Sequence, residues 1–437
     1  MTDAPVGRSG RRLTATVTDL EVARQKGFLV GVVMRGSDQE EAQRSLEELA
    51  LLTDTAGSDP IDGELVTRDQ IDPATYIGSG KASELAAVTA ALDIDVVVFD
   101  NPLSPAQQRN LQKIFNCDVV DREAVILDIF AENATTRQGA LQVELAMYRY
   151  NLPRLRGRGL ELSQQAGGIG ARRGPGETKL ETDRRRIQAR ITRLTRELED
   201  VSRVLDTQRK ARKRSSTPHV ALVGYTNAGK STLLNQLTDA EVLARDRLFS
   251  TLDSTVRKLE LPSGPPAVIS DTVGFVRRLP HHLVEAFRST LIEVREADLL
   301  LHVVDASDPD PPGQIAAVRE VLVEIEAEEI PESIVFNKID VADDIALRRL
   351  RNLYPRALFI SARTGEGISR LQTAIGEALE GQTTLLHLAI PYERGDVVAS
   401  AYRLGEVIAV KHDEQGTLLD VRVPPQSASE FSDFLTA

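Results

Sequence analysis

A glycine-rich stretch that ends in lysine and serine is the strongest chemical signal in this sequence. Residues 224–231 read GYTNAGKS, the G-x-x-x-x-G-K-S pattern of a phosphate-binding loop. The apolar residues 219–223 predict a strand before it, and residues 232–237 predict a helix after it. In that context backbone N–H groups and the helix N-terminus face phosphate oxygens. We predict that Lys230 bridges the β- and γ-phosphates of a nucleotide and that the Ser231 hydroxyl ligates Mg²⁺.

A second signal is the tetrapeptide Asp-Thr-Val-Gly at residues 271–274, which follows an apolar strand pattern at residues 267–269. An aspartate at a strand end is often only a turn residue. Here it follows the phosphate-binding loop in the order that nucleotide hydrolases use. We therefore predict that Asp271 holds Mg²⁺ through water and that the Gly274 N–H contacts the γ-phosphate.

The choice of base is indicated by Asn-Lys-Ile-Asp at residues 337–340, directly after the apolar stretch 333–336. The Asp340 carboxylate can accept from two N–H groups of guanine, and adenine lacks that pair of donors. The wrong base would leave a buried carboxylate unpaired, so the discrimination is strong. The backbone of residues 361–363, Ser-Ala-Arg, ends another strand pattern and is predicted to meet the guanine oxygen.

Between the phosphate-binding loop and Asp271, residues 249–253 read FSTLD. A threonine of this segment should coordinate Mg²⁺ only when the γ-phosphate is present. We assign that role to Thr251, and Thr255 is the alternative.

These motifs define the predicted site. The catalytic residues are Lys230, Thr251, Asp271 and Gly274. The metal ligands are Ser231 and Thr251. The nucleotide contacts are Gly224, Tyr225, Thr226, Asn227, Ala228, Gly229, Lys230, Ser231, Thr232, Phe249, Ser250, Thr251, Leu252, Asp253, Asp271, Thr272, Val273, Gly274, Asn337, Lys338, Ile339, Asp340, Ser361, Ala362 and Arg363. The predicted activity is hydrolysis of GTP to GDP with Mg²⁺.

Two residues depart from the commonest pattern of GTP hydrolases. Where many of these enzymes place a glutamine that orients water, this chain has Phe275. Intrinsic hydrolysis should then be slow, on the order of 10⁻³ s⁻¹ or below, unless a partner supplies a catalytic group. Alternatively, Phe275 only packs its loop and another residue polarises the water. The second departure is Asn227, whose amide oxygen could help ligate K⁺ between the phosphates, or could make a local backbone bond.

The elements that position these loops indicate an α/β multidomain protein. Strand patterns alternate with helix patterns from residue 28 to residue 131, which implies a small, mainly parallel sheet. A second strand–helix alternation surrounds the nucleotide motifs. The last residues predict a small α+β module with strands at 397–403, 407–411 and 418–423. We divide the chain into a tail (1–25), an N-terminal βα domain (26–133), a helical hairpin (134–217), a central P-loop GTPase domain (218–381) and a C-terminal module (382–437).

Two heptad patterns predict that the hairpin is an antiparallel coiled coil. The first runs from Leu141 to Leu155 and contains Pro153, which should kink or end that helix near Leu152. The second runs from Ile187 to Leu205, followed by a basic linker at 210–218. Glycines crowd the loop between the two patterns.

The hairpin region is basic, whereas the chain as a whole is acidic. The chain has a net charge of −12, yet residues 151–216 hold 18 Lys and Arg against 8 Asp and Glu. A basic run can be a solvated helix face. Because it surrounds a glycine-rich loop, we predict contacts to a polyanion such as RNA, dominated by phosphates. The predicted RNA-binding residues are Arg154, Arg156, Arg158, Arg172, Arg173, Arg184 and Arg185.

The composition indicates in which cellular compartment the protein is expected. Cys117 is the single cysteine, which excludes an internal disulfide and fits a reducing compartment. The N-terminus lacks an apolar signal-peptide core, and no apolar run is long enough for a membrane span. We expect a cytoplasmic protein, and nothing in the sequence requires more than a monomer.

Beyond the nucleotide motifs, three stretches resemble the HflX family of translation-associated GTPases. They are Tyr-Ile-Gly-Ser-Gly-Lys at 76–81, Gly-Ala-Leu-Gln-Val-Glu-Leu-Ala at 139–146, and the run from Gly167 to Arg185 that contains RGPGETKLETDRR. The resemblance covers most of the chain. The segment 78–81 could be a second phosphate loop, but a capped helix start or an RNA contact by Lys81 is favoured.

The resemblance implies a protein that binds the large ribosomal subunit and its rRNA in the GTP form. It implies that stalled or idle ribosomes are split, notably under heat stress, and that the ribosome stimulates GTP hydrolysis. Two alternatives stay open on the sequence alone. One is a GTP-gated adaptor whose coiled coil binds another protein, and the other is a GTPase of ribosome assembly.

Overall fold

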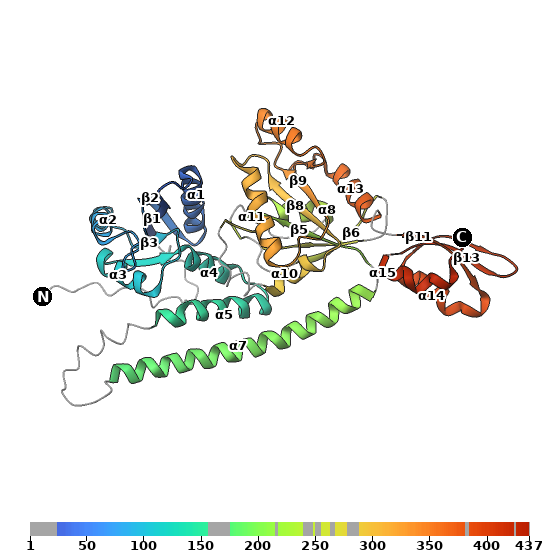
Figure 1. The fold of residues 1–437 in the computed structure, drawn as a ribbon, viewed down its shortest axis with the longest axis horizontal. Coiled ribbons are helices and arrows are strands. Elements are labelled where there is room, and N and C mark those ends of the chain that lie inside the picture. The colour runs from blue at the N-terminus through green and yellow to red at the C-terminus, as the bar shows by residue number, and fades with distance from the viewer. Residues whose placement is uncertain are drawn as a thin grey trace, which may run out of the picture.

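The computed structural model describes residues 24–155, 175–214, 217–238, 248–249, 255–262, 267–277, 288–380, 384–423 and 425–436. Three globular parts follow one another along the longest axis (Figure 1). The N-terminal βα domain lies at one end, the domain with the nucleotide motifs in the middle and the C-terminal module at the other end. The long helix α7 runs beside the first two parts. The expected multidomain α/β architecture is confirmed.

The N-terminal domain is a four-stranded parallel sheet in the order β2-β1-β3-β4. The buried run in β1, with both faces covered, explains its nearly continuous apolar sequence. Its strands are β1 (Gln25–Met34), β2 (Ser58–Arg68), β3 (Val96–Phe99) and β4 (Asp118–Asp121). Its helices are α1 (Gln39–Thr55), α2 (Ser79–Ala91), α3 (Pro105–Phe115) and α4 (Arg122–Asn133).

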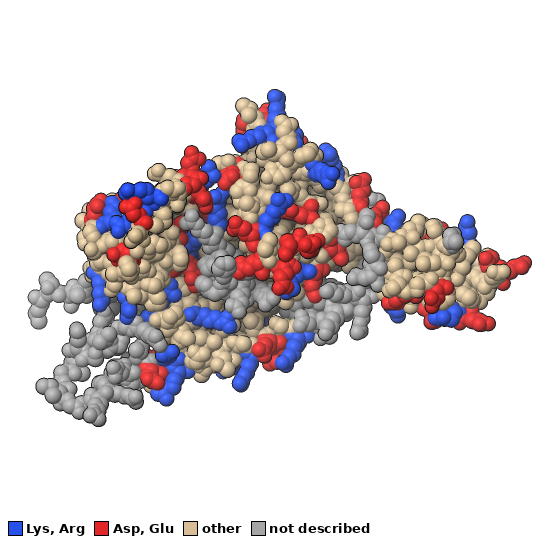
Figure 2. Space-filling view, viewed as in Figure 1, with Lys and Arg blue, Asp and Glu red and all other residues tan. Residues whose placement is uncertain are grey.

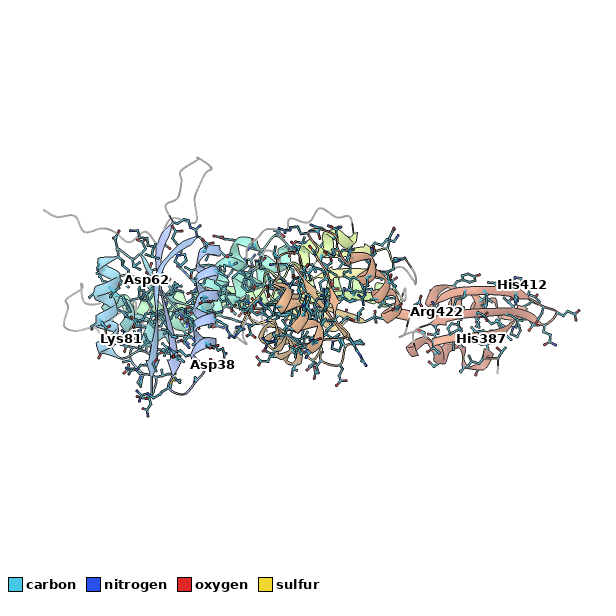
Figure 3. All side chains as sticks on the ribbon, turned by 90° about the horizontal axis from the view of Figure 1, so that it is seen from above. Asp38, Asp62, Lys81, His387, His412 and Arg422 are labelled. Atoms are coloured by element: carbon cyan, nitrogen blue, oxygen red, sulfur yellow. The ribbon has the colours of Figure 1, made fainter. Side chains whose placement is uncertain are left out.

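Helix α2 begins within the segment 78–81, the candidate for a second phosphate loop. Gly78 precedes the helix with φ +83°, a conformation that favours glycine. The Lys81 ammonium pairs with Glu64 at 2.5 Å and with Glu84 at 2.7 Å. Figure 3 shows Lys81 on the N-terminal domain, at the opposite end of the molecule from the C-terminal module. With its charge held by two carboxylates, Lys81 fits a structural helix start better than a phosphate site.

The helical hairpin consists of α5 (Arg137–Arg154) and α7 (Pro175–Arg214). Leu141 and Leu145 pack with Ile191 and Leu194, so the two heptad patterns meet in one apolar seam. Helix α5 ends two residues later than Pro153 suggested. Pro153 cannot donate to the carbonyl four residues before it, but the Leu155 N–H still bonds to the Asn151 carbonyl, so the helix continues past the proline. Helix α7 continues through residues predicted as a linker.

The central domain is a six-stranded sheet in the order β10-β9-β8-β5-β7-β6, parallel except for β6. Apolar side chains of its inner strands are fully buried between helices on both faces. The strands are β5 (His219–Gly224), β6 (Thr255–Leu259), β7 (Ala267–Asp271), β8 (Leu299–Asp305), β9 (Glu332–Asn337) and β10 (Leu358–Phe359). The helices are α8 (Lys230–Thr238), α10 (Arg288–Arg295), α11 (Pro311–Glu324), α12 (Asp344–Leu353) and α13 (Ile368–Glu380).

The C-terminal module corrects one expectation. Residues 397–403 were predicted as a strand, but they lie in helix α14 (Gly395–Leu404). Val397 and Ala401, four residues apart, are buried on one helical face, and this spacing outweighs the β-propensity of the valines. The missed strand is β11 (Thr384–Pro391), in which buried and exposed residues alternate.

The module contains a three-stranded antiparallel sheet in the order β11-β13-β12. Its other two strands are β12 (Glu406–His412) and β13 (Gly416–Val423). Its short helices are η1 (Tyr392–Arg394), α15 (Pro425–Ala428) and η2 (Ser429–Phe434). Helix α14 and Phe431 cover one face of the sheet. Figure 3 places His387 and His412 on this module, and it places Arg422 at the border with the central domain, where Arg422 pairs with Glu380 of α13 at 3.4 Å.

Among the described residues, no helix combines the length and the apolar character that a membrane crossing requires.

Candidate nucleotide-binding site

The phosphate-binding loop joins β5 to α8 in a backbone geometry that requires glycine at two positions. Gly224 has φ +150°, and an added Cβ would lie 2.1 Å from the Val303 carbonyl oxygen. Gly229 has φ +89°, and an added Cβ would lie 2.3 Å from Nδ2 of Asn337. Any side chain at either position would therefore displace the neighbouring strand or loop. The two glycines of the motif are thus explained by close packing of the loop.

Lys230 is the first residue of α8 and is buried. Its Nζ donates to the carbonyl oxygens of Gly224 at 3.1 Å and Tyr225 at 2.8 Å. Burial lowers the pKa of Lys230 to about 8, against the raising effect of Asp271. The backbone of the loop surrounds this ammonium group. When phosphate oxygens bind there, the ammonium can donate to them in place of the two carbonyl oxygens. The geometry agrees with the predicted role of Lys230.

Ser231 and Asp271 come together although they are forty positions apart in the chain. The Ser231 hydroxyl donates to Oδ2 of Asp271 at 2.6 Å, and both residues are buried. Oδ1 of Asp271 accepts from the Thr272 N–H at 2.9 Å, which fixes the carboxylate plane. A hydroxyl and a carboxylate side by side are hard oxygen ligands of the kind that Mg²⁺ prefers. These residues fit a magnesium site next to the phosphate loop.

The segment after Asp271 lies against the phosphate-binding loop. A Cβ added at Gly274 would lie 2.8 Å from Cα of Thr226 and 3.2 Å from Nζ of Lys230. The Phe275 N–H bonds to the Gly224 carbonyl at 3.1 Å, and the Thr226 N–H bonds to the Phe275 carbonyl at 2.8 Å. Gly274 therefore lies beside the lysine that is predicted to hold the γ-phosphate.

The base-reading motifs are tied to the phosphate loop by one side chain. Asn337, at the end of β9, donates from Nδ2 to the Ala228 carbonyl at 2.9 Å and accepts on Oδ1 from the Ala362 N–H at 2.9 Å. This bridge sets the distance between the phosphate loop and the predicted guanine contacts. The sequence predicted Asn337 as a nucleotide contact, and this bridging role was not predicted. A signal existed, since an amide at the end of a buried strand needs buried partners.

Asp340 is oriented by two neighbouring side chains. Its carboxylate forms an ion pair with Arg363 and accepts from the Ser361 hydroxyl. The hydrogen bond from Ser361, together with Arg363, lowers the pKa of Asp340 despite partial burial. Lys338 has φ +65° and pairs with Asp305 at 2.7 Å. The carboxylate is ionised at neutral pH, as acceptance from two guanine N–H groups requires.

The predicted switch segment is described only in part. Phe249 is buried, with φ +55°, and its ring meets that of Phe130 edge-on at 4.7 Å between centroids. Ser250, Thr251, Leu252 and Asp253 lie outside the described residues, so the assignment of Thr251 stays a prediction. The alternative, Thr255, is the first residue of β6 and is paired with Asp271 in the sheet.

The two departures from the commonest pattern have different surroundings. Phe275 is 1% exposed and belongs to an apolar cluster that also contains Phe130 of the N-terminal domain. Its side chain packs in the protein interior, and the identity of the group that orients the water stays a prediction. Asn227 has φ +58°, a left-handed conformation that asparagine tolerates. K⁺ binding beside Asn227 stays a prediction.

The predicted RNA-binding arginines fall into three groups. Arg156, Arg158, Arg172 and Arg173 lie outside the described residues. Arg184 and Arg185 are exposed on α7. Arg154 turns inward: its guanidinium lies 3.4 Å from the centre of the Tyr150 ring and pairs with Asp121 at 3.1 Å. The contacts of Arg154 are those of a residue that anchors the hairpin to the N-terminal domain.

A doubly wound sheet, a phosphate-binding loop at its strand ends, and the sequence motifs for Mg²⁺ and guanine together define a P-loop GTPase. Three family models match the chain in order. They are described as GTP-binding GTPase N-terminal (residues 43–131), GTP-binding GTPase Middle Region (133–212) and 50S ribosome-binding GTPase (219–338).

Curated relatives match nearly the whole chain. GTPase HflX of Lacrimispora saccharolytica is 44% identical over 415 residues, which cover 95% of this chain and 97% of the relative. GTPase HflX of Escherichia coli is 44% identical over 389 residues, 88% of this chain and 91% of the relative. The chain belongs to the HflX family of GTPases.

A solved structure is also similar to this chain. It is the crystal structure of a GTP-binding protein from the hyperthermophilic archaeon Sulfolobus solfataricus in complex with GDP. The match covers 81% of this chain and 98% of that chain, with 22% sequence identity and a TM-score of 0.41.

Proposed function

We propose that this GTPase binds the large ribosomal subunit in its GTP form and dissociates stalled or idle ribosomes, and that the subunit stimulates hydrolysis. The observation that carries the proposal is the combination of the family match with an exposed basic helix. Residues 219–338 match the family described as 50S ribosome-binding GTPase. The relatives that share the N-terminal domain and the hairpin are named GTPase HflX. The proposed location is the cytoplasm, and the proposed active form is a monomer.

The hairpin supplies the proposed RNA contact. On α7, Arg184 and Arg185 follow one another and are exposed. Further along the helix, Arg190 is held by Glu144 of α5 through two hydrogen bonds of 2.9 and 2.8 Å. That bidentate pair fixes the helix, while the exposed arginines stay available for phosphates. Figure 2 shows that acidic and basic side chains are interspersed on the visible face, so the proposed contact depends on local arginine clusters and not on a uniformly basic face.

In the proposed cycle, Lys230 exchanges its two carbonyl partners for β- and γ-phosphate oxygens. Asp340 accepts from guanine, and the Gly274 N–H contacts the γ-phosphate beside Lys230. When bound, Mg²⁺ held by Ser231 and near Asp271 would neutralise charge that develops on the phosphate oxygens. The Phe275 side chain has no hydrogen-bonding group and is buried, so it cannot orient the attacking water. We therefore expect intrinsic hydrolysis to be slow and a partner surface to complete the site.

Co-sedimentation with purified large subunits tests the proposal. We expect binding with a non-hydrolysable GTP analogue to exceed binding with GDP. Each lost phosphate contact should reduce the magnitude of the salt slope by about 0.7 to 0.9. Arg184→Glu combined with Arg185→Glu should weaken binding and leave intrinsic turnover unchanged. The matched control is Arg348→Glu combined with Arg349→Glu, the same charge change on exposed residues of α12. Binding that ignores the nucleotide would contradict the proposal.

A further inference from the structure

The third residue of the phosphate-binding loop carries a buried hydroxyl group. Thr226 is 5% exposed. Its Oγ1 is buried and has no hydrogen-bond partner among the residues that the structure describes. A buried hydroxyl without a partner costs free energy, so its retention at this position requires an explanation. The hydroxyl of Thr226 is therefore a candidate for a contact with a bound ligand.

Neighbouring buried hydroxyls differ from that of Thr226, because they have protein partners. The Thr272 hydroxyl donates to the Leu222 carbonyl at 2.6 Å. The Ser231 hydroxyl donates to Asp271, also at 2.6 Å. Suitable acceptors are thus present in this part of the domain, and Thr226 is not directed at one of them.

The backbone of Thr226 is fixed on both sides. Its N–H donates to the Phe275 carbonyl at 2.8 Å. The carbonyl group of the preceding residue, Tyr225, accepts from Nζ of Lys230 at 2.8 Å. Thr226 therefore lies between the lysine of the phosphate-binding loop and the segment that follows Gly274.

The methyl group of Thr226 locates its side chain. A Cβ added at Gly274 would lie 2.8 Å from Cγ2 of Thr226 and 3.2 Å from Nζ of Lys230. No more than the sum of these two distances therefore separates the Thr226 methyl carbon from the Lys230 ammonium. A β-branched side chain has few rotamers, and here one branch lies against Gly274. The hydroxyl on the same Cβ thus lies beside the two groups that are predicted to contact the γ-phosphate, the Lys230 ammonium and the Gly274 N–H.

We propose that Thr226 is a further catalytic residue, whose hydroxyl donates a hydrogen bond to a γ-phosphate oxygen of GTP. The hydroxyl gives up no protein acceptor when it donates to this oxygen, and a hydrogen bond to a charged acceptor is stronger than one between neutral groups. During hydrolysis water attacks the γ-phosphorus, the bond to the oxygen of GDP breaks, and one proton of the water leaves with the phosphate. Thr226 keeps its proton and stabilises the charge on the γ-phosphoryl oxygens, while the orientation of the water is left to another group.

The same contact distinguishes the two nucleotides. GDP has no γ-phosphate, so the Thr226 hydroxyl should contribute to the reaction and binding of GTP and not to the binding of GDP. A residue that only maintained the shape of the loop would affect both nucleotides.

The test measures kcat/KM for GTP and Kd for GDP with the full-length protein and no ribosomes. Thr226→Val replaces the hydroxyl by a methyl group of similar size. We expect it to lower kcat/KM by roughly tenfold or more and to leave the Kd for GDP within about twofold of the wild-type value. Its melting temperature without nucleotide should not fall, because no hydrogen bond within the protein is lost. Thr226→Ser keeps the hydroxyl, so its kcat/KM should stay within about threefold of the wild-type value.

Thr238→Val is the matched control. It makes the same chemical change at the last residue of α8, where the hydroxyl donates to the Leu234 carbonyl at 2.7 Å, and it should leave kcat/KM unchanged. If Thr226→Val fails to fold, the comparison of Thr226→Ala with Thr226→Ser decides alone. The proposal is overturned if Thr226→Val keeps the wild-type kcat/KM, if it weakens GDP binding as strongly as it lowers kcat/KM, if Thr226→Ser loses as much as Thr226→Val, or if Thr238→Val loses equally.

Discussion

At the scale of single residues, the site depends on side chains that are oriented by contacts within the protein. Lys230 is held by two loop carbonyls, Ser231 by Asp271, and Asp340 by Ser361 and Arg363. Lys230 can exchange its carbonyl acceptors for phosphate oxygens, and Asp340 can exchange its hydrogen-bond donors for guanine N–H groups. Such preorganisation reduces the reorganisation that binding and hydrolysis require.

The choice of base gives the prediction at this scale. Asp340→Asn replaces one acceptor oxygen by an N–H₂ donor, which repels the guanine N–H and suits the xanthine carbonyl. We expect the affinity for GDP to fall on the order of 100-fold and the affinity for xanthosine diphosphate to rise, since charged hydrogen bonds contribute about 1.5–3 kcal/mol each. Titration of both nucleotides measures the change. Asp344→Asn, on the exposed first turn of α12, is the control. Unchanged selectivity would refute the assignment of Asp340.

At the scale of elements, the helical hairpin depends on a narrow apolar seam. Leu194 is fully buried between the two helices, beside Leu141 and Leu145. Leu194→Ala should destabilise the hairpin by about 2–5 kcal/mol, because the cavity is added to the lost burial. Denaturant unfolding followed by circular dichroism measures it. Thr192→Ala, an exposed position two residues away, should change the stability little. If the two variants were equally stable, the seam would not hold the hairpin.

The same scale shows how far the sequence could predict the structure. Regular periodicity located the parallel strands, the two hairpin helices and the strand–loop–helix around Lys230. Residues 397–403 were misassigned because two valines suggested a strand, while burial of Val397 and Ala401 follows the helical period. The hydrogen bond from the Tyr225 hydroxyl to Glu48 of α1 could not be predicted, because it joins residues far apart in sequence and has no local pattern. Arg154 was assigned to RNA for its charge, and only tertiary packing revealed its partners.

At the scale of the whole molecule, acid should weaken the central domain through a buried pair. Nδ1 of the fully buried His302 lies 2.5 Å from Glu332, which also pairs with Arg319 at 2.7 Å. Burial lowers the pKa of His302 below 6.5, so the neutral ring donates from Nδ1. Burial would raise the pKa of Glu332, but the bonds from His302 and Arg319 outweigh it and lower that pKa from 4.5 to about 2.

Both shifts favour the folded state at neutral pH. The stabilisation from Glu332 is complete above pH 4.5 and is lost as the pH falls from 4.5 toward 2. His302 further reduces the stability of the folded state below pH 6.5, because its imidazole binds a proton more readily in the unfolded chain. We expect thermal unfolding scans to show a melting temperature that falls with pH below 6.5. Glu332→Gln should lower it at pH 7 and flatten its decline below pH 4.5. A melting temperature independent of pH in this range would contradict the assignment.

The domain with the nucleotide motifs lies next to the N-terminal domain, and α7, which carries the exposed arginines of the proposed ribosome contact, runs beside both. Multiple-turnover GTP hydrolysis by the full-length protein, with and without purified large ribosomal subunits, tests this arrangement most directly. We predict slow turnover alone and an increase of at least about tenfold with subunits, because Phe275 leaves the water-orienting role to a partner. Turnover that is the same with and without subunits would contradict the account.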